Sequence, residues 1–229
     1  MVAQGPAEPE CYTFRSSALR RLVHRYETIL RETSMNRLLL AGLLSCAVSV
    51  QALAALPTGT AAPTFKTQAS LAGKEFTYDL TKALKKGPVV VYFYPGAFTG
   101  GCNIQAHTFA EDMDKFKSAG ATVIGVSLDK IETLNAFSSD PQYCAGKLPV
   151  ASDADGAIAA SYQLKVMDGR PGMKDSRGVD LDHKFAERTT FIVTKDGKIA
   201  ATVGGVSPAE NVEKTLAIVQ DLAAGKPVS

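Results

Sequence analysis

The chain has 229 residues, of which 45% are hydrophobic and 21% are charged, and its formal net charge is +2. This composition is typical of an ordinary globular protein, and the small net charge gives no reason to expect nucleic acid or an acidic surface as a partner. Four cysteines are too few for a disulfide scaffold at this length.

Residues 35–54 have the pattern of a secretory signal peptide. Arg37 precedes an apolar run at residues 38–50, and an A-x-A cleavage site ends at Ala54. The pattern predicts translation from Met35, cleavage after Ala54, and a periplasmic or secreted protein that is not in the membrane in its mature form.

Other interpretations of this region stay open. Residues 38–56 are just long enough for a transmembrane anchor, although polar residues within them weaken it, and residues 43–46 loosely resemble a lipoprotein cleavage box. Residues 1–34 precede the expected start, so we interpret them as a spurious or disordered extension. Cleavage leaves one domain, residues 55–229, with two of the four cysteines.

Strands and a short helix are predicted at the beginning of this domain. Short strands are expected on either side of residues 72–73, followed by a brief helix over residues 80–84. Residues 89–94 are a continuous apolar run rich in β-branched and aromatic side chains, which indicates a buried strand. Pro95 and Gly96 end that strand.

A longer helix is predicted to begin near Cys102. Its apolar residues recur at helical spacing, at Ala106, Phe109, Met113 and Phe116. The first turn of a helix has unpaired N–H groups and the positive end of the helix dipole, and both stabilise a thiolate. The sequence therefore places a cysteine where it can act as a nucleophile, although a buried structural cysteine is the alternative.

The turn before Cys102 carries residues suited to this chemistry. Thr99 stands three residues earlier, close enough for its hydroxyl to hydrogen-bond the sulfur. Pro95 has no N–H group and can shield the site from water. Gly100 and Gly101 leave backbone N–H groups uncovered for a small substrate.

The middle of the domain predicts a second strand and helix. Residues 121–128 have the pattern of a buried strand, and Asp129 is the expected N-cap of the next helix. Residues 148–152 are predicted to be an edge-like segment, residues 153–162 a turn and a helix, and residues 167–187 an extended loop.

A hairpin and a helix are predicted at the C-terminal end. Strands over residues 188–193 and 198–203 are joined by Asp196-Gly197, a strong hairpin signal. Residues 207–210 are a capping box with proline at the first helical position, and the apolar face of a terminal helix follows. This order of elements predicts an α/β fold, with a mixed central sheet and helices on both faces.

Pro95, Thr99 and Cys102 match the P-x-x-x-T-x-x-C active-site motif of peroxiredoxins, with a hydrophobic strand in front of it. The chain is most similar to bacterial Q-type members, the bacterioferritin comigratory proteins, of the alkyl hydroperoxide reductase/thiol-specific antioxidant superfamily. The resemblance covers roughly residues 63–222 in order.

Three positions depart from the family pattern. Gly100 stands where the family often has proline, and Gln105 stands where it often has glutamate. His107 occupies the position at which many Q-type members carry their resolving cysteine. The resolving cysteine is therefore elsewhere in this chain, or it is absent.

The resemblance implies a thioredoxin-like fold and a thiol peroxidase that reduces hydrogen peroxide or alkyl hydroperoxides. Cys102 would be the peroxidatic nucleophile that becomes a sulfenic acid, and Arg188 would be the active-site arginine. Cys144, which lies 42 residues downstream, would form a disulfide with Cys102. A thioredoxin-like protein would reduce it, no metal, haem or flavin is needed, and a monomer or weak homodimer is expected.

Other functions stay open at this point. A periplasmic thiol–disulfide oxidoreductase of the same fold would carry C-x-x-C, but Thr99 and Gln105 stand three residues to either side of Cys102. A binding module without catalysis is the second alternative. Arg188 would then be an ordinary surface residue, and Cys144 a spectator. The three histidines are scattered without metal-ligand spacing.

Overall fold

The computed structural model describes residues 55–228, and the expected start, signal segment and cleavage site lie outside these residues. Seven strands of the described chain form one sheet in the order β2-β1-β5-β4-β3-β8-β9. These strands are β1 (Lys66–Leu71), β2 (Lys74–Asp79), β3 (Val89–Phe93), β4 (Thr122–Ser127), β5 (Val150–Ser152), β8 (Thr189–Val193) and β9 (Ile199–Gly204).

The sheet is mixed. The pairs β3–β4 and β4–β5 are parallel. The pairs β1–β2, β1–β5, β3–β8 and β8–β9 are antiparallel. Because parallel neighbours need a crossover connection, a helix follows both β3 and β4 in the sequence.

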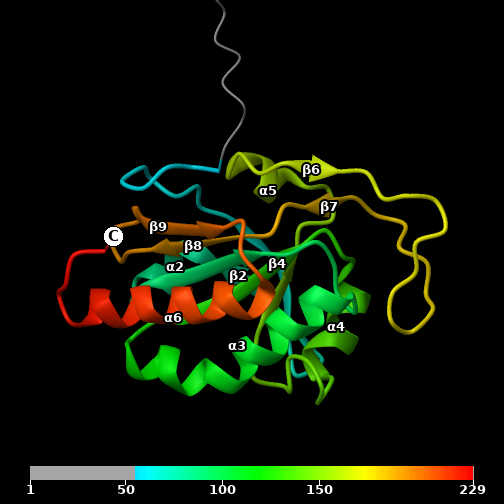
Figure 1. The fold of residues 1–229 in the computed structure, drawn as a ribbon, viewed down its shortest axis with the longest axis horizontal. Coiled ribbons are helices and arrows are strands. Elements are labelled where there is room, and N and C mark those ends of the chain that lie inside the picture. Colours follow the sequence, from blue (N-terminus) through cyan, green and yellow to red (C-terminus); the bar gives the residue numbers. More distant parts are fainter. Residues whose placement is uncertain (1–54, 229) are drawn as a thin grey trace, which may run out of the picture. The chain divides into compact units, whose positions relative to one another are not determined.

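Helices cover both faces of the sheet. They are α2 (Leu80–Leu84), α3 (Gly100–Ser118), α4 (Ile131–Ser139), α5 (Ala157–Ser161) and α6 (Pro208–Ala223). In Figure 1, α3, α4 and α6 lie together on one side of the sheet, and their buried residues form one apolar cluster. The buried residues of α2 and α5 belong to a second cluster on the other face. The predicted fold class is confirmed.

Strand β3 shows why the sheet is covered on both sides. Val90 and Tyr92 belong to the cluster under α3 and α6, whereas Val89, Val91 and Phe93 belong to the opposite cluster. All five side chains are at most 1% exposed. Since successive side chains of a strand point to opposite faces, a continuous apolar run requires packing on both.

Two local predictions near the C-terminus are confirmed. Gly197 has a φ of +81° in the turn between β8 and β9, a conformation that glycine adopts without strain. Ser207 caps α6, because its hydroxyl accepts a hydrogen bond from the Glu210 N–H at 3.4 Å, and Pro208 stands at the first helical position.

Two other local predictions were wrong. The segment predicted as edge-like contains β5, which lies inside the sheet between β1 and β4. Asp129 is not the N-cap of α4, because Lys130 holds that position without a capping side-chain bond. The Asp129 carboxylate instead accepts hydrogen bonds from the Ala97 N–H at 2.8 Å and the Ser127 hydroxyl at 2.7 Å. A long-range contact thus takes the place of the local one.

The loop predicted over residues 167–187 has paired ends. The strands β6 (Val166–Met167) and β7 (Phe185–Ala186) form a separate antiparallel pair. Residues 168–184, drawn mainly in yellow in Figure 1, run between these strands, and we call them the long loop.

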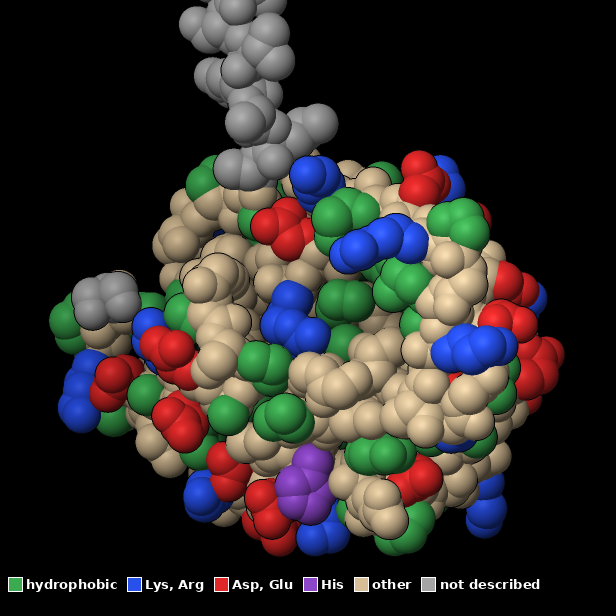
Figure 2. All heavy atoms as spheres, turned by 45° about the vertical axis from the view of Figure 1, so that its right-hand side comes forward, with side chains coloured by type: hydrophobic (Ala, Val, Ile, Leu, Met, Phe, Trp, Pro, Cys, Tyr) green, Lys and Arg blue, Asp and Glu red, His purple; other side chains and the backbone are tan. Residues whose placement is uncertain are grey.

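The molecular surface mixes both signs of charge. On the face shown in Figure 2, acidic and basic side chains are interspersed, without a broad patch of either sign. Within residues 55–228, no helix has the length and apolar character that crossing a membrane requires.

Candidate active site

Cys102 lies in the first turn of α3 and is 2% exposed. Residues 94–99 connect β3 to this helix, and we call them the active-site turn. The first backbone hydrogen bond of α3 runs from the Asn103 N–H to the Thr99 carbonyl at 2.8 Å. The N–H groups of residues 100–102 precede that bond, so they remain available at the positive end of the helix.

Phe98 gives the active-site turn an unusual backbone conformation. Its φ is +57°, in the left-handed region that non-glycine residues seldom adopt. The Phe98 ring is buried, with centroids 5.0 Å from Phe137 and 5.7 Å from Tyr143. Packing against these two rings, which come from α4 and the turn after it, holds the strained residue in place.

Arg188, which is distant from Cys102 in the sequence, contacts it in the fold. Thr189 pairs with Phe93 in the antiparallel β3–β8 ladder, so the residue before β8 lies beside the active-site turn. The Arg188 Nη2 donates to the Cys102 sulfur at 3.2 Å. The structure therefore brings a permanent positive charge to a thiol 86 positions earlier in the chain.

Gly101 leaves the space that this contact needs. A Cβ atom at that position would lie 3.3 Å from Arg188 Nη2 and 3.2 Å from Pro208 Cγ. Both distances are tighter than ordinary van der Waals contact, so a side chain at position 101 would push against the guanidinium and α6.

Gln105 holds the opposite edge of the guanidinium. Its side chain is fully buried, and its Oε1 accepts a hydrogen bond from Arg188 Nη1. Its Nε2 donates to Asn211 Oδ1 at 3.0 Å. The sequence marks Gln105 only as a departure from the family pattern, and it indicates no role for Asn211. The available signal was an asparagine four residues before Thr215 and eight before Val219, on the buried face of α6.

Thr99 does not make the contact predicted for it. Its hydroxyl donates to the Gly96 carbonyl at 2.8 Å and not to the Cys102 sulfur. This bond closes the active-site turn on itself, because the donor and acceptor are three residues apart. Pro95 is partly buried at the start of the same turn.

Cys144 lies in a different turn, after α4, and is completely buried. Both Cys102 and Cys144 are free thiols and belong to the same apolar cluster. Burial raises the pKa of the Cys144 thiol well above its ordinary value, and the Asp140 carboxylate raises it further. The two sulfurs are not joined in the structure.

The long loop packs on the active-site turn. The Ser176 N–H donates to the Phe98 carbonyl at 2.8 Å, and the Arg177 guanidinium carbon lies 3.4 Å from the centre of the Phe98 ring. Near Gly96 in the same turn, His183 Nε2 lies 3.1 Å from Asp129 Oδ1, and the two form an ion pair when the imidazole is protonated. The turn is therefore held from β4 and from the long loop as well as by α3.

His107 lies away from this site, as its helical position predicts. It is half-exposed and forms a pair with Glu111 at 3.4 Å on the surface of α3. In the part of the chain that the structure describes, His, Cys, Asp and Glu side chains form no group of three or more that could hold a metal ion.

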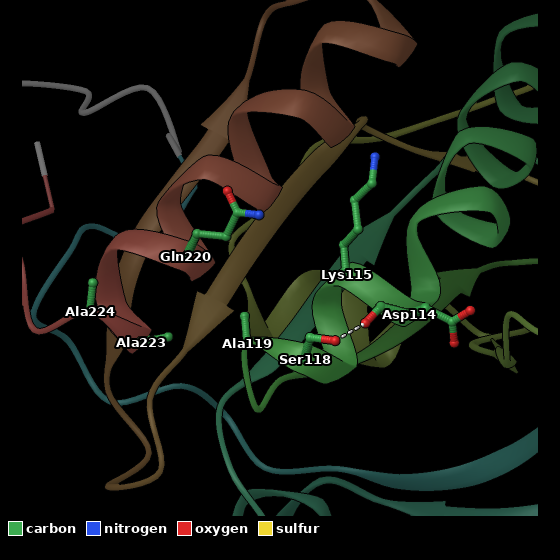
Figure 3. A pocket seen from close by; sticks show the side chains of 7 residues that line it. All are labelled: Asp114, Lys115, Ser118, Ala119, Gln220, Ala223 and Ala224. Carbon is green, nitrogen blue, oxygen red and sulfur yellow. Dashed lines mark hydrogen bonds between the residues drawn. The ribbon is translucent and has the colours of Figure 1, made fainter.

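A surface hollow of about 600 Å³ lies between the C-terminal ends of α3 and α6. Figure 3 shows its lining, with Ser118 bonded to the Asp114 carbonyl. Cys102 and this hollow are at opposite ends of α3, which is 19 residues long. At 1.5 Å per residue the two places are about 20 Å apart, and the hollow contains no cysteine or histidine.

Comparison with solved structures shows that peroxiredoxins have the same fold. Peroxidoxin BcpB from Mycobacterium tuberculosis matches with a TM-score of 0.61 and 26% identity, over 73% of this chain and 98% of that one. Peroxiredoxin Q from Xanthomonas campestris matches with a TM-score of 0.54 and 27% identity, over 68% and 90%. The protein is thus an enzyme of the peroxiredoxin class, on a thioredoxin-like fold.

The sequence comparisons narrow this class. Chloroplastic peroxiredoxin Q from Sedum lineare is 33% identical over 141 residues, which are 60% of this chain and 66% of that protein. A model of the AhpC/TSA family matches residues 58–202. The chain belongs to the AhpC/TSA family, and the resemblance to Q-type members is confirmed.

Proposed function

We propose that the protein is a thiol-dependent hydroperoxide reductase in which Cys102 attacks the peroxide. Peroxiredoxins perform thiol peroxidase chemistry in general, and Cys102 is the residue that we assign to it in this chain. The observation that carries it is the 3.2 Å contact between the Cys102 sulfur and Arg188 Nη2. A guanidinium at hydrogen-bond distance favours the thiolate, which is the nucleophilic form of cysteine.

The reaction is a two-electron transfer. The thiolate attacks the terminal oxygen of the hydroperoxide, the S–O bond forms, and the O–O bond breaks. The sulfur is oxidised to a sulfenic acid, while the departing oxygen takes a proton and leaves as water or an alcohol. Negative charge moves from sulfur to the departing oxygen, so the site must stabilise charge at both atoms.

The residues around the sulfur are suited to that charge. The guanidinium of Arg188 has several donors in one plane, so it can hold the sulfur and a peroxide oxygen together. The N–H groups of residues 100–102 supply further donors at the helix end. The Thr99 hydroxyl, whose hydrogen goes to Gly96, keeps oxygen lone pairs that can accept the hydrogen of the peroxide. Pro95 borders the site without adding a competing donor.

Cys144 is proposed to resolve the sulfenic acid. Its thiol attacks the oxidised sulfur, a disulfide forms, and one water leaves. Cys144 is completely buried, so we expect the turn around it to open before its sulfur meets the oxidised sulfur of Cys102. A thioredoxin-like protein would then reduce the disulfide. A periplasmic or secreted location remains a prediction from residues 35–54.

The test is stopped-flow consumption of hydrogen peroxide by the reduced protein. We expect the wild type to consume one equivalent in a fast phase and Cys102→Ser to be slower by about 10³-fold or more. Cys144→Ser should keep the fast phase but lose sustained turnover with a thioredoxin. Equal rates for the wild type and Cys102→Ser would contradict the proposal and favour a binding module.

Mass spectrometry after one equivalent of peroxide tests the resolving step. We expect a mass loss of two hydrogens and a disulfide-linked peptide pair that contains Cys102 and Cys144. A stable sulfenic acid without that linked pair would make the protein a one-Cys enzyme. Reduction of insulin at a rate independent of peroxide would instead favour a thiol–disulfide oxidoreductase.

A further inference from the structure

Asn211 lies in the first turn of α6, where it has no contact with the Cys102 sulfur. It is 1% exposed, and both the NH₂ group and the oxygen of its side-chain amide form hydrogen bonds. Its Nδ2 donates to the Val203 carbonyl of β9 at 3.0 Å. Its Oδ1 accepts from the Thr190 hydroxyl at 2.6 Å and from Gln105 Nε2 at 3.0 Å.

These contacts determine which way the Asn211 amide faces. The Val203 carbonyl is an acceptor only, so it requires the NH₂ group of Asn211. The oxygen of Asn211 must then face β8 and α3, where two donors meet it. A reversed amide would bring two acceptors together in a buried place and leave donors without partners, which is costly away from water.

The orientation passes from Asn211 to Gln105. Because Asn211 presents an oxygen, Gln105 must present its NH₂ group, and its Oε1 is left facing the guanidinium. Arg188 Nη1 donates to that oxygen. With one edge of the planar guanidinium held, Arg188 Nη2 is directed toward the Cys102 sulfur at 3.2 Å.

The hydrogen-bonded path from Asn211 through Gln105 to Arg188 also leaves the positive charge of Arg188 unneutralised. Gln105 and Asn211 are both neutral, and within residues 55–228 the structure gives Arg188 no carboxylate partner. An ion pair would fix the guanidinium equally well, but it would offset the positive charge that the thiolate and the departing oxygen need.

We propose that Asn211 is a positioning residue for the peroxidase reaction, which acts on Arg188 through Gln105. The proposal rests on the function proposed above for Cys102 and Arg188. Helix α6 thereby takes part in the active site, although none of its side chains touches the reacting atoms.

The experiment measures the second-order rate constant of the first, peroxide-dependent step by stopped flow. Asn211→Leu keeps the branched shape of the side chain, with a larger volume, and removes both hydrogen-bonding ends. We expect the rate constant to fall about tenfold or more, because small errors in the placement of a catalytic group are expensive.

A double-mutant cycle separates positioning from a general loss of stability. If Asn211 acts through Gln105, Asn211→Leu should have little further effect in a Gln105→Leu background, so the two effects are not additive. Additive effects, or a rate constant within twofold of the wild type for Asn211→Leu, would overturn the proposal. Asn211→Ala provides a second variant with the same predictions if Leu disrupts the packing.

Thr215→Val is the matched control on the same helix. The Thr215 hydroxyl donates to the Asn211 carbonyl at 2.6 Å, in the buried interior of α6. Its loss should lower the melting temperature without changing the rate constant. Cys102→Ser separates a failure of the proposed function from a failure of this inference. If Cys102→Ser reacts at the wild-type rate, the proposed function fails; if it is slow while Asn211→Leu is not, only the role of Asn211 fails.

Discussion

Cys102 and Cys144 lie in one apolar cluster and are both almost inaccessible, yet their surroundings are opposite. Cys102 stands in the first turn of a 19-residue helix with a guanidinium nitrogen 3.2 Å from its sulfur. Cys144 lies in a turn after the shorter helix α4. Besides burial, the Asp140 carboxylate opposes ionisation of its thiol. Both thiols are buried, so exposure alone does not distinguish the two cysteines. They differ in the sign of the nearby charge and in their position relative to a helix end, which are features that govern thiolate formation.

The largest expected effect comes from removing the cation at Cys102. Arg188→Leu should lower the second-order rate constant for hydrogen peroxide by about 10²–10³-fold, the usual loss when one donor to developing charge is removed. Arg170→Leu removes the same charge from an exposed position of the long loop and should leave the rate constant unchanged. Similar losses in both variants would mean that net charge, and not the contact with Cys102, sets the rate.

Thiol labelling compares the two cysteines directly. With iodoacetamide at pH 7, we expect Cys102 to be alkylated about 10²-fold faster than Cys144, because the thiolate is the reacting form and burial suppresses it at Cys144. Peptide mass spectrometry over time gives both rates in one sample. In denaturant the two rates should become equal. Faster labelling of Cys144 in the native protein would reverse the comparison.

The raised pKa of Cys144 predicts a loss of stability at alkaline pH. Above about pH 8.5 the unfolded thiol releases its proton while the folded thiol retains it. The native state then binds more protons, so the free energy of unfolding falls as pH rises, by up to about 1.4 kcal/mol per pH unit. Urea titrations from pH 7 to 10 should show this slope in the wild type relative to Cys144→Ala. Parallel curves for the two proteins would contradict it.

The smallest expected effect concerns His183 and the long loop. Burial alone would lower the pKa of His183, but the Asp129 carboxylate, the Lys184 carbonyl and Asp182 outweigh it, so the net direction is upward. Protonated His183 therefore adds stability to the docked loop below about pH 6.5, and this is lost as pH rises through the raised pKa.

Limited trypsin digestion measures that effect on the loop. At pH 6 the wild type should be cut in residues 168–184 about threefold more slowly than His183→Gln, and the two should converge by pH 9. Comparing the proteins at each pH removes the pH dependence of trypsin itself. A ratio that does not change with pH would show that His183 packs on the turn without an electrostatic role.

Much of the fold could be predicted from the sequence because its signals are local. The apolar run of β3, the hairpin at Asp196-Gly197 and the capping box at Ser207 each depend on a few neighbouring residues. The wrong predictions, for β5 and for Asp129, concern segments whose partners are distant. Asp129 is a residue type that often caps helices, but its carboxylate accepts a hydrogen bond from the Ala97 N–H, 32 residues earlier.

The sequence by itself determined the order of the elements and the place of Cys102 at a helix start, because periodicity, turn residues and caps act over a few residues. Only the tertiary structure decided that Arg188, Gln105 and Asn211 form a connected path to that sulfur. These contacts join positions 83 to 106 residues apart, and such pairings follow from the register of β3 with β8 and the packing of α6 on α3, which no local pattern specifies.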